Sequence, residues 1–353
     1  MKIALYYPHN WLASWYTLGG YANTLRDMGH EVIDCPFPGN LVHDVDNVRS
    51  RMPTIDQLNS VDCILLMFME YIQPWLASVY GLELWKHVKV PIVARYDESF
   101  DRQDLGLFDR WEEFIKWAPD INLNFFPAHQ DAERYGGQWL VYGADLIKFH
   151  CTSPQTKKYD LAFVGSFYPL RQQYLAKLSG FLGNDVTFNV GQAIVQDLSG
   201  IRSEESTDLL AENYRQIKIF FCLPPMSRLL VCKVFEVMAC GTFVMFPMLP
   251  GDAAHNCTAF NAGLEIVYYE HGYMKKNAEQ IQYYLTHEEE RETIANAGRD
   301  RVYQDYTLQQ MLERMLWIAR PDISVSPRLT FDARRRLGIG TDVKPVEVES
   351  GTL

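Results

Sequence analysis

The sequence lacks the features of several special classes of protein. Its seven cysteines include no C-x-x-C pair, which argues against a zinc ribbon and against a thioredoxin-like redox motif. No uninterrupted apolar run approaches the ~18 residues of a membrane-spanning helix, and the first residues do not resemble a secretory signal. We therefore expect a protein of a reducing compartment, the cytoplasm.

An excess of positive charge is also missing. The formal net charge is −11, which argues against general electrostatic attraction to nucleic acids or anionic membranes but leaves room for a local basic site. Clustered aspartates of the D-x-D type, which hold metal ions, are scarce, and the match at 44–46 falls in an early loop. We therefore expect no bound metal.

Apolar segments are plentiful and regularly ordered. The chain has 353 residues, of which 48% are hydrophobic, and this length predicts about two domains. Near-continuously apolar segments alternate with amphipathic ones, a pattern typical of parallel sheets covered by helices on both faces. We expect strands at 2–7, 31–35, 61–67, 90–96, 121–125 and 138–142, and in the second half at 159–165, 185–190, 217–223, 242–246 and 263–269.

A polar, proline-containing stretch at 150–158 separates the two halves. We therefore predict an α/β protein with two Rossmann-like, doubly wound domains that face a cleft. The predicted domains are 1–150 and 151–320, and an extended tail follows at 321–353.

The loop after the first strand is the first candidate site. Gly19 and Gly20 precede a predicted helix, where they would let a ligand approach the backbone and leave N–H groups for an anion; a tight turn without a ligand is the alternative. The same loop carries His9, Trp11 and Trp15. The two tryptophans could form an apolar platform for a sugar or base, or could belong to the core or an interface.

The second candidate site is the segment AFVGSFYPLR. It runs from a strand through Gly165 and Ser166 into a helix that begins near Pro169, a residue suited to the first helical position. Arg171 would lie in the first turn, where a cation opposes the helix dipole. A bound phosphate would explain a cation there, and an arginine exposed to solvent is the alternative.

The third candidate site is a helix predicted at 229–240 and ended by Gly241. Lys233 and Glu236 are three residues apart and therefore share one face, and Arg228 precedes them. A weak surface ion pair is one interpretation. However, Glu236 lies in a largely apolar segment, where a carboxylate needs a polar partner.

These residues resemble a known family. KVFEVMACGTFVMFP is similar to the R/K-x-F-E-x-x-A-C-G signature of the group 1 glycosyltransferases, most closely to the spore-maturation-protein (CgeB-like) branch. Four further segments resemble these enzymes in the same order, so that the resemblance covers residues 1–314: LGGYANTLRDMGHEV, VYGADLIKFH, YDLAFVGSFYPLR and the helical region at 287–315.

The resemblance implies the GT-B fold, with closing C-terminal helices that return toward the N-terminal domain. It implies that the first domain binds an acceptor and the second a nucleotide-sugar such as a UDP-sugar. The implied activity is metal-independent, retaining transfer of the sugar to a hydroxyl group, with no cofactor besides this co-substrate.

The resemblance also assigns roles to residues of the donor site. Glu236 would hydrogen-bond the ribose, and Arg171 and Lys233 would lie near the diphosphate, where fixed cations can stabilise the leaving group without a metal. Many relatives have a glutamate at the position of Arg228, so that role is not carried over, and Arg228 could instead supply a third cation. The remaining predicted donor-binding residues are Gly165, Ser166, Gly19 and Gly20.

The choice of a catalytic base stays open. Asp97, followed by Glu98, comes after the fourth predicted strand at the edge facing the cleft, and His9 is a second candidate. Front-face attack would need no strong base. The alternatives in function are a nucleotide-sugar epimerase or phosphorylase and a non-catalytic binding protein. The acceptor could be a glycan, a small metabolite or a modified nucleobase, and the sequence does not indicate an oligomeric state.

Overall fold

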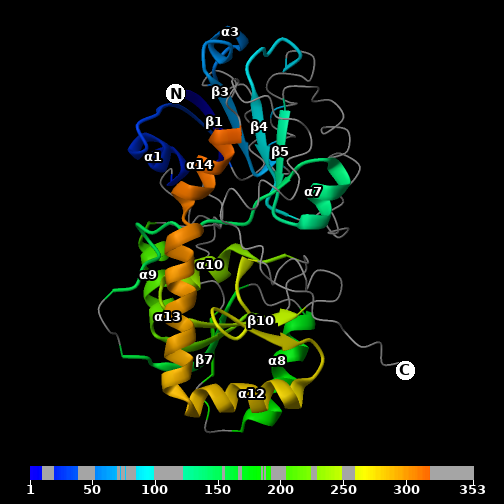
Figure 1. Cartoon of the computed structure of the whole chain (residues 1–353), viewed down its shortest axis with the longest axis vertical. Helices are drawn as coiled ribbons and strands as arrows, with labels where there is room; N and C mark the ends of the chain where they lie inside the picture. The colour runs from blue at the N-terminus through cyan, green and yellow to red at the C-terminus, as the bar shows by residue number, and fades with distance from the viewer. Residues whose placement is uncertain are drawn as a thin grey trace.

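The computed structural model places two sheets in two lobes that follow one another along the long axis of the molecule (Figure 1). It describes residues 1–9, 20–38, 52–69, 72, 76, 85–98, 122–152, 156–165, 169–183, 186, 188–191, 204–223, 229–248 and 259–318.

The N-terminal lobe contains a six-stranded sheet with the order β2-β1-β3-β4-β5-β6. Each neighbouring pair is parallel. Strands β3 and β4 are buried along their whole length, as expected for a sheet covered on both faces. The strands are β1 (Lys2–His9), β2 (Glu31–Pro38), β3 (Cys63–Met67), β4 (Ile92–Arg95), β5 (Asn122–Phe126) and β6 (Gln138–Trp139).

The second lobe contains a five-stranded sheet with the order β11-β10-β9-β7-β8, again with parallel neighbours. Its strands are β7 (Tyr159–Val164), β8 (Phe188–Gly191), β9 (Ile217–Phe221), β10 (Phe243–Met248) and β11 (Val267–Glu270). The strand predicted at 263–269 begins later than expected, because a turn occupies its first residues: the Gly263 amide donates to the Ile266 carbonyl.

Helices accompany both sheets, which confirms the predicted doubly wound α/β class. In the second lobe, α12 packs beside α8, and α13 packs beside α10 and β10. The N-terminal lobe has α1 (Gly20–Asp27), α3 (Ile55–Leu58) and α7 (His129–Tyr135). The later helices are α8 (Pro169–Leu182), α9 (Glu204–Arg215), α10 (Cys232–Ala239), α12 (Met274–Thr286), α13 (Glu288–Asp305) and α14 (Leu308–Ile318).

Within the described residues, the chain crosses between the lobes twice, and the two crossings touch. Figure 1 shows α14 returning to the N-terminal lobe, where it packs against α1. The Ala144 amide donates to the Tyr306 carbonyl and the Leu308 amide to the Ala144 carbonyl, both at 2.8 Å. A Cβ atom at Gly143 would lie 2.4 Å from the Thr307 carbonyl oxygen, so only glycine allows this approach. The predicted return of the C-terminal helices is therefore confirmed.

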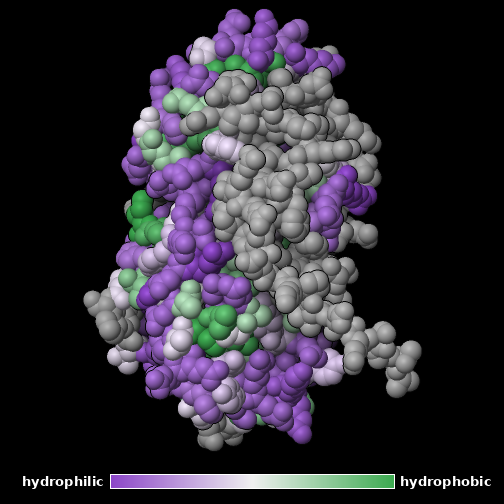
Figure 2. Space-filling model, viewed as in Figure 1, coloured by the Kyte–Doolittle hydropathy of each residue, from purple (hydrophilic) through white to green (hydrophobic). Residues whose placement is uncertain are grey.

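The coloured surface in Figure 2 is largely hydrophilic, and its apolar residues form separate patches. Within the described ranges, none of the helices combines the length and the apolar character that a membrane crossing requires. The predicted domain limits at 150 and 320 stay a prediction, although the two sheets end and begin on either side of residue 150.

Candidate active site

The second sheet changes winding direction between β7 and β9, which lie side by side although β8 separates them in sequence. In parallel α/β sheets, ligands bind outside the carboxyl ends of the strands at such a switch point. Here that place is formed by Val164 at the end of β7, by Gly165 directly after it and by Cys222 after β9.

Lys233, the second residue of α10, reaches this switch point. Its ammonium donates to the Val164 carbonyl at 3.0 Å. A Cβ atom at Gly165 would lie 2.6 Å from the Lys233 nitrogen, so the glycine makes room for the ammonium. The predicted Gly165 turn and the predicted lysine thus lie in direct contact.

Arg171 converges on the same place from α8, which begins at Pro169 as predicted. The Arg171 side chain is buried, and its guanidinium carbon lies 5.0 Å from the centroid of the Phe163 ring. The Lys233 nitrogen lies 5.2 Å from the same centroid. Two cations therefore share one aromatic ring at the carboxyl end of β7, an arrangement that suits a bound anion.

The environment of Lys233 weakens its hold on a proton. Burial lowers the pKa of the Lys233 ammonium, and the nearby charge of Arg171 lowers it further, while Cys222, Cys232 and Glu236 oppose the shift. An anion between the two cations would relieve their repulsion and favour the protonated lysine.

Glu236 follows Lys233 by one turn of α10 and is 2% exposed, so it is not part of a surface ion pair. The helix is shorter than predicted because Val231 has an extended backbone and acts as its N-cap. Its end agrees with the prediction, since Gly241 adopts a φ of 73° directly after the C-cap. The short helix keeps Lys233 close to its N-terminus, where the helix dipole also favours an anion.

Two residues that the sequence analysis missed lie behind the cations. The buried Cys222 thiol interacts electrostatically with both Lys233 and Arg171, yet burial raises its pKa to about 11, so it stays a neutral thiol. Tyr269 of β11 donates its hydroxyl to the Cys222 carbonyl at 2.7 Å. Both residues lie at or near the carboxyl ends of predicted strands, and this position was the signal that could have found them.

The N-terminal lobe places Asp97 in a buried ion pair. The Arg95 Nε atom donates to the Asp97 carboxylate at 3.0 Å, and the two side chains are 0% and 1% exposed. Arg95 also donates to the Leu140 carbonyl, and the Tyr142 hydroxyl donates to the Asp97 carbonyl. Burial raises the pKa of Asp97 to about 6, although Arg95 opposes the shift. This carboxylate is poorly placed to meet an acceptor, whereas the neighbouring Glu98 is half-buried.

The other predicted site residues are only partly described. His9 is the last residue of β1, and its backbone pairs with Pro38, while its side chain lies outside the described part. Gly20 is the first residue of α1. Trp11, Trp15, Gly19, Ser166 and Arg228 lie outside the described residues.

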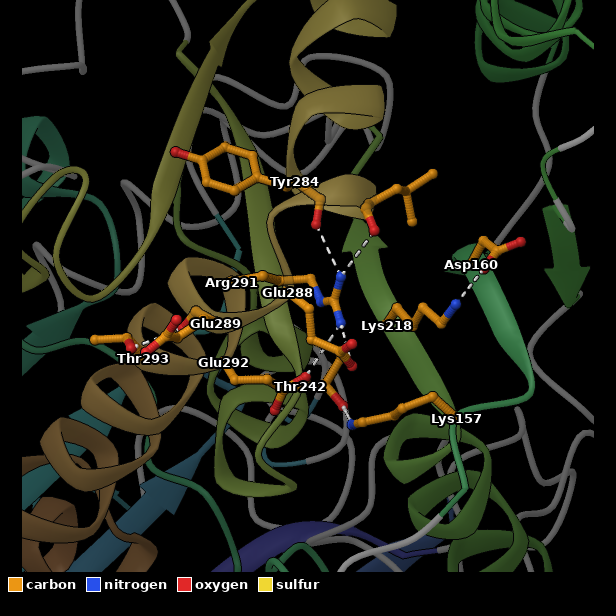
Figure 3. Close-up of polar contacts among 11 residues, drawn as sticks. Lys157, Asp160, Lys218, Thr242, Tyr284, Glu288, Glu289, Arg291, Glu292 and Thr293 are labelled. Atoms are coloured by element: carbon orange, nitrogen blue, oxygen red, sulfur yellow. Dashed lines mark hydrogen bonds and ion pairs between the residues drawn. The ribbon is translucent and has the colours of Figure 1, made fainter.

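The opposite edge of the second sheet also gathers charged side chains, but these pair with one another (Figure 3). Buried Arg291 bonds to the Glu288 carboxylate at 3.2 Å and to the Tyr284 carbonyl at 2.8 Å. Lys218 bonds to Asp160 at 2.7 Å. The Arg291 contacts join the start of α13 to the end of α12, and the Lys218 contact joins β9 to β7, which indicates a structural role. Among the residues described, no group of three or more His, Cys, Asp or Glu side chains could share a metal ion.

Comparison with known proteins finds one matching family model and several similar solved structures. Residues 196–317 match a family model described as glycosyl transferase-like, and no curated protein matches the chain. HepE of Anabaena in complex with UDP-glucose has a TM-score of 0.60 and 12% identity, covering 90% of this chain and 98% of that one. Sucrose-phosphate synthase of Thermosynechococcus elongatus has a TM-score of 0.63 and 13% identity, covering 92% and 100%.

A third similar structure is an alpha-glucosyltransferase in complex with UDP-glucose and DNA containing an abasic site. Its TM-score is 0.60 at 12% identity, covering 90% of this chain and 99% of that one. These likenesses confirm the predicted GT-B fold. The segment that matches the glycosyl transferase-like family model includes α10 and its two site residues Lys233 and Glu236.

Proposed function

We propose that this protein is a glycosyltransferase that moves a sugar from a nucleoside-diphosphate sugar to a hydroxyl acceptor. The observation that carries the proposal is the convergence of Lys233 and Arg171 on the Phe163 ring at the switch point of the second sheet. UDP-glucose bound to the similar structures HepE and alpha-glucosyltransferase supports a UDP-sugar as the donor.

The proposed chemistry assigns a task to each described group. The bond between the anomeric carbon and the diphosphate oxygen breaks, and negative charge collects on the leaving group. Lys233, Arg171 and the N-terminus of α10 stabilise that charge, so the reaction needs no metal ion. Glu236 accepts hydrogen bonds from the ribose hydroxyls. The acceptor hydroxyl attacks from the face that the diphosphate leaves and gives its proton to the departing diphosphate oxygen, which retains the anomeric configuration and needs no strong protein base.

The remaining assignments are part of the same proposal. The lobe at 1–150 binds the acceptor on a platform of Trp11 and Trp15, and the lobe at 151–320 binds the donor, with Gly165 and Ser166, Gly19 and Gly20, and Arg228 around the diphosphate. His9 and Asp97 stay the two candidate bases for the case in which the diphosphate does not take the acceptor proton. The protein belongs in the cytoplasm and in the CgeB-like branch.

Glycans, small metabolites and modified nucleobases are the acceptor classes to screen by mass spectrometry.

The role of Glu236 predicts a ribose-specific loss of affinity. We expect Glu236→Gln to weaken UDP binding by about tenfold, because a hydrogen bond to a charged group is replaced by a weaker one. The variant should bind 2′,3′-dideoxy-UDP as the wild type does, since that ligand lacks the hydroxyls. Titration calorimetry measures both affinities.

The control for this experiment is Glu279→Gln, whose carboxylate is 63% exposed on α12. Equal losses for the two ligands would contradict the ribose assignment. If UDP, GDP, ADP and dTDP all failed to bind the wild type, the donor class would be wrong. Net conversion of the donor without any acceptor would instead identify an epimerase or phosphorylase.

The lowered pKa of Lys233 predicts a pH-dependent affinity. Only the protonated amine attracts a diphosphate, so above its pKa each further pH unit should weaken binding by about tenfold. This decline should begin at lower pH than for an ordinary lysine, because burial lowers the Lys233 pKa. Affinity titrations from about pH 7 to pH 10 test this, and Lys233→Arg should flatten the profile because a guanidinium stays charged.

The exposed Lys276 offers a matched control, since its ammonium is 64% exposed in the same lobe. Lys276→Arg should keep the wild-type profile. A wild-type profile that is already flat, or a decline that Lys233→Arg leaves in place, would contradict the assignment of Lys233.

A further inference from the structure

A buried chain of hydrogen bonds lies behind the two cations. Tyr269 of β11 is 1% exposed and donates to the carbonyl of Cys222, the residue that follows β9. Its ring stacks on Phe221 with centroids 4.3 Å apart. The hydroxyl therefore fixes one backbone carbonyl at the carboxyl end of β9.

Tyr174 and Asn277 continue the chain toward α12. The Asn277 amide nitrogen donates to the Tyr174 hydroxyl at 2.9 Å and to the Glu270 carbonyl at 2.9 Å. The Tyr174 ring also lies near the rings of Tyr269 and Phe221, with centroid distances of 6.4 and 6.2 Å. Glu270 directly follows Tyr269 in β11, so these bonds connect α8, through Asn277 of α12 and the end of β11, to the residue after β9.

This chain ends at the carbonyl of Cys222, which belongs to the candidate anion site. Tyr174 follows Arg171 by three residues and therefore lies on the same side of α8, one turn away. The charge of Arg171 acts on both Tyr269 and Cys222, and the charge of Lys233 acts on Cys222. The hydrogen bonds thus link the helix that carries Arg171 to the strand end next to Lys233.

The polar groups in this chain need an explanation, because phenylalanine would fill the same space without burying hydroxyls. Burial raises the pKa of Tyr174 to about 12 and also raises the pKa of Tyr269 well above its ordinary value, so neither hydroxyl acts as an acid in the reaction. The hydroxyls add hydrogen bonds, which have a preferred geometry that apolar packing lacks. Each bond holds two backbone segments at one separation and orientation.

We propose that Tyr269 and Tyr174 are positioning residues that hold α8 and the end of β9 in register, so that Arg171 and Lys233 converge on one diphosphate. The inference rests on the proposed function and deepens it. Neither tyrosine touches the substrate; each acts through the two cations.

The test compares each nucleoside diphosphate with its own nucleoside. UDP, GDP, ADP and dTDP are titrated into the wild type, and the tightest ligand is then used for the variants. Tyr269→Phe should weaken the diphosphate by about fivefold, the effect of one lost hydrogen bond, and leave the nucleoside affinity unchanged. Tyr174→Phe should act in the same direction, and the double variant should lose less than the sum because both hydroxyls serve one chain.

Tyr303→Phe is the matched control. Its hydroxyl also donates to a backbone carbonyl, that of Ala239, at 2.9 Å, but at the other end of α10 from Lys233. This variant should keep the wild-type ratio of diphosphate to nucleoside affinity.

The outcomes separate the inference from the proposed function. If none of the four diphosphates bound the wild type, the proposed function would fall, and the inference with it. If one bound, but the two tyrosine variants kept the wild-type affinity ratio or lost both ligands equally, the positioning role alone would be wrong. If Tyr269→Phe did not fold, Tyr174→Phe would decide, and failure of both to fold would assign the chain a purely structural role.

Discussion

Lys233→Ala is expected to lower kcat/KM for the nucleotide-sugar by about 100-fold, with little change in the free energy of unfolding. The ammonium lies at the carboxyl end of β7, bonded to the Val164 carbonyl and above the Phe163 ring. Charge on the leaving diphosphate grows as its bond to the sugar breaks, so the lost stabilisation is largest in the transition state. Steady-state kinetics should therefore show a fall in kcat as well as a rise in KM.

Arg171→Ala should have a similar effect, since its guanidinium lies above the same ring. The double variant should lose less than the product of the two single effects, because both cations contact one anion. Lys276→Ala is the control, as its ammonium pairs with Glu270 at 2.7 Å on the surface of the same lobe. Full activity in the double variant would show that the two cations do not form the donor site.

Arg95→Met is expected to lower the free energy of unfolding by about 3–5 kcal/mol, measured by urea denaturation. Both members of the Arg95–Asp97 pair are buried, so removing the arginine leaves an uncompensated carboxylate in the interior. Arg95→Met combined with Asp97→Leu should recover most of the loss, because no buried charge remains. Lys2→Met, which breaks an exposed pair with Glu31 in the same lobe, should change stability by about 1 kcal/mol or less.

A substitution of Asp97 distinguishes a positioning role of this residue from a role as catalytic base. If it positions the end of β4, Asp97→Asn should lose stability while the folded enzyme keeps a near wild-type kcat. A stable Asp97→Asn protein with a kcat lowered by orders of magnitude would instead support the catalytic base predicted from the sequence. The buried position of Asp97 beside Arg95 favours the first result.

The period of the apolar residues was enough to predict the class of fold and most strands. Strands β3 and β4 are continuous apolar segments because both faces of the sheet are covered. Such segments can be recognised from neighbouring residues in the sequence. Local signals also located the start of α8 at Pro169 and the end of α10 before Gly241. The start of α10 was predicted too early, because Leu229 and Leu230 are buried without being helical.

The family resemblance already predicted that Arg171 and Lys233 lie near one diphosphate, but the tertiary structure decided which residues meet. The positions of Arg171 and Lys233 in the sequence do not predict that both side chains lie over the Phe163 ring. This contact depends on β9 lying beside β7 in the sheet. The burial of Asp97 depends in the same way on Arg95 and Tyr142, the latter from the segment that leads to the second lobe. Periodicity and turn residues are signals between residues that are close in sequence, so the sequence alone determined the helices and strands. Strand order and long-range packing bring distant charges together, and they determined the site.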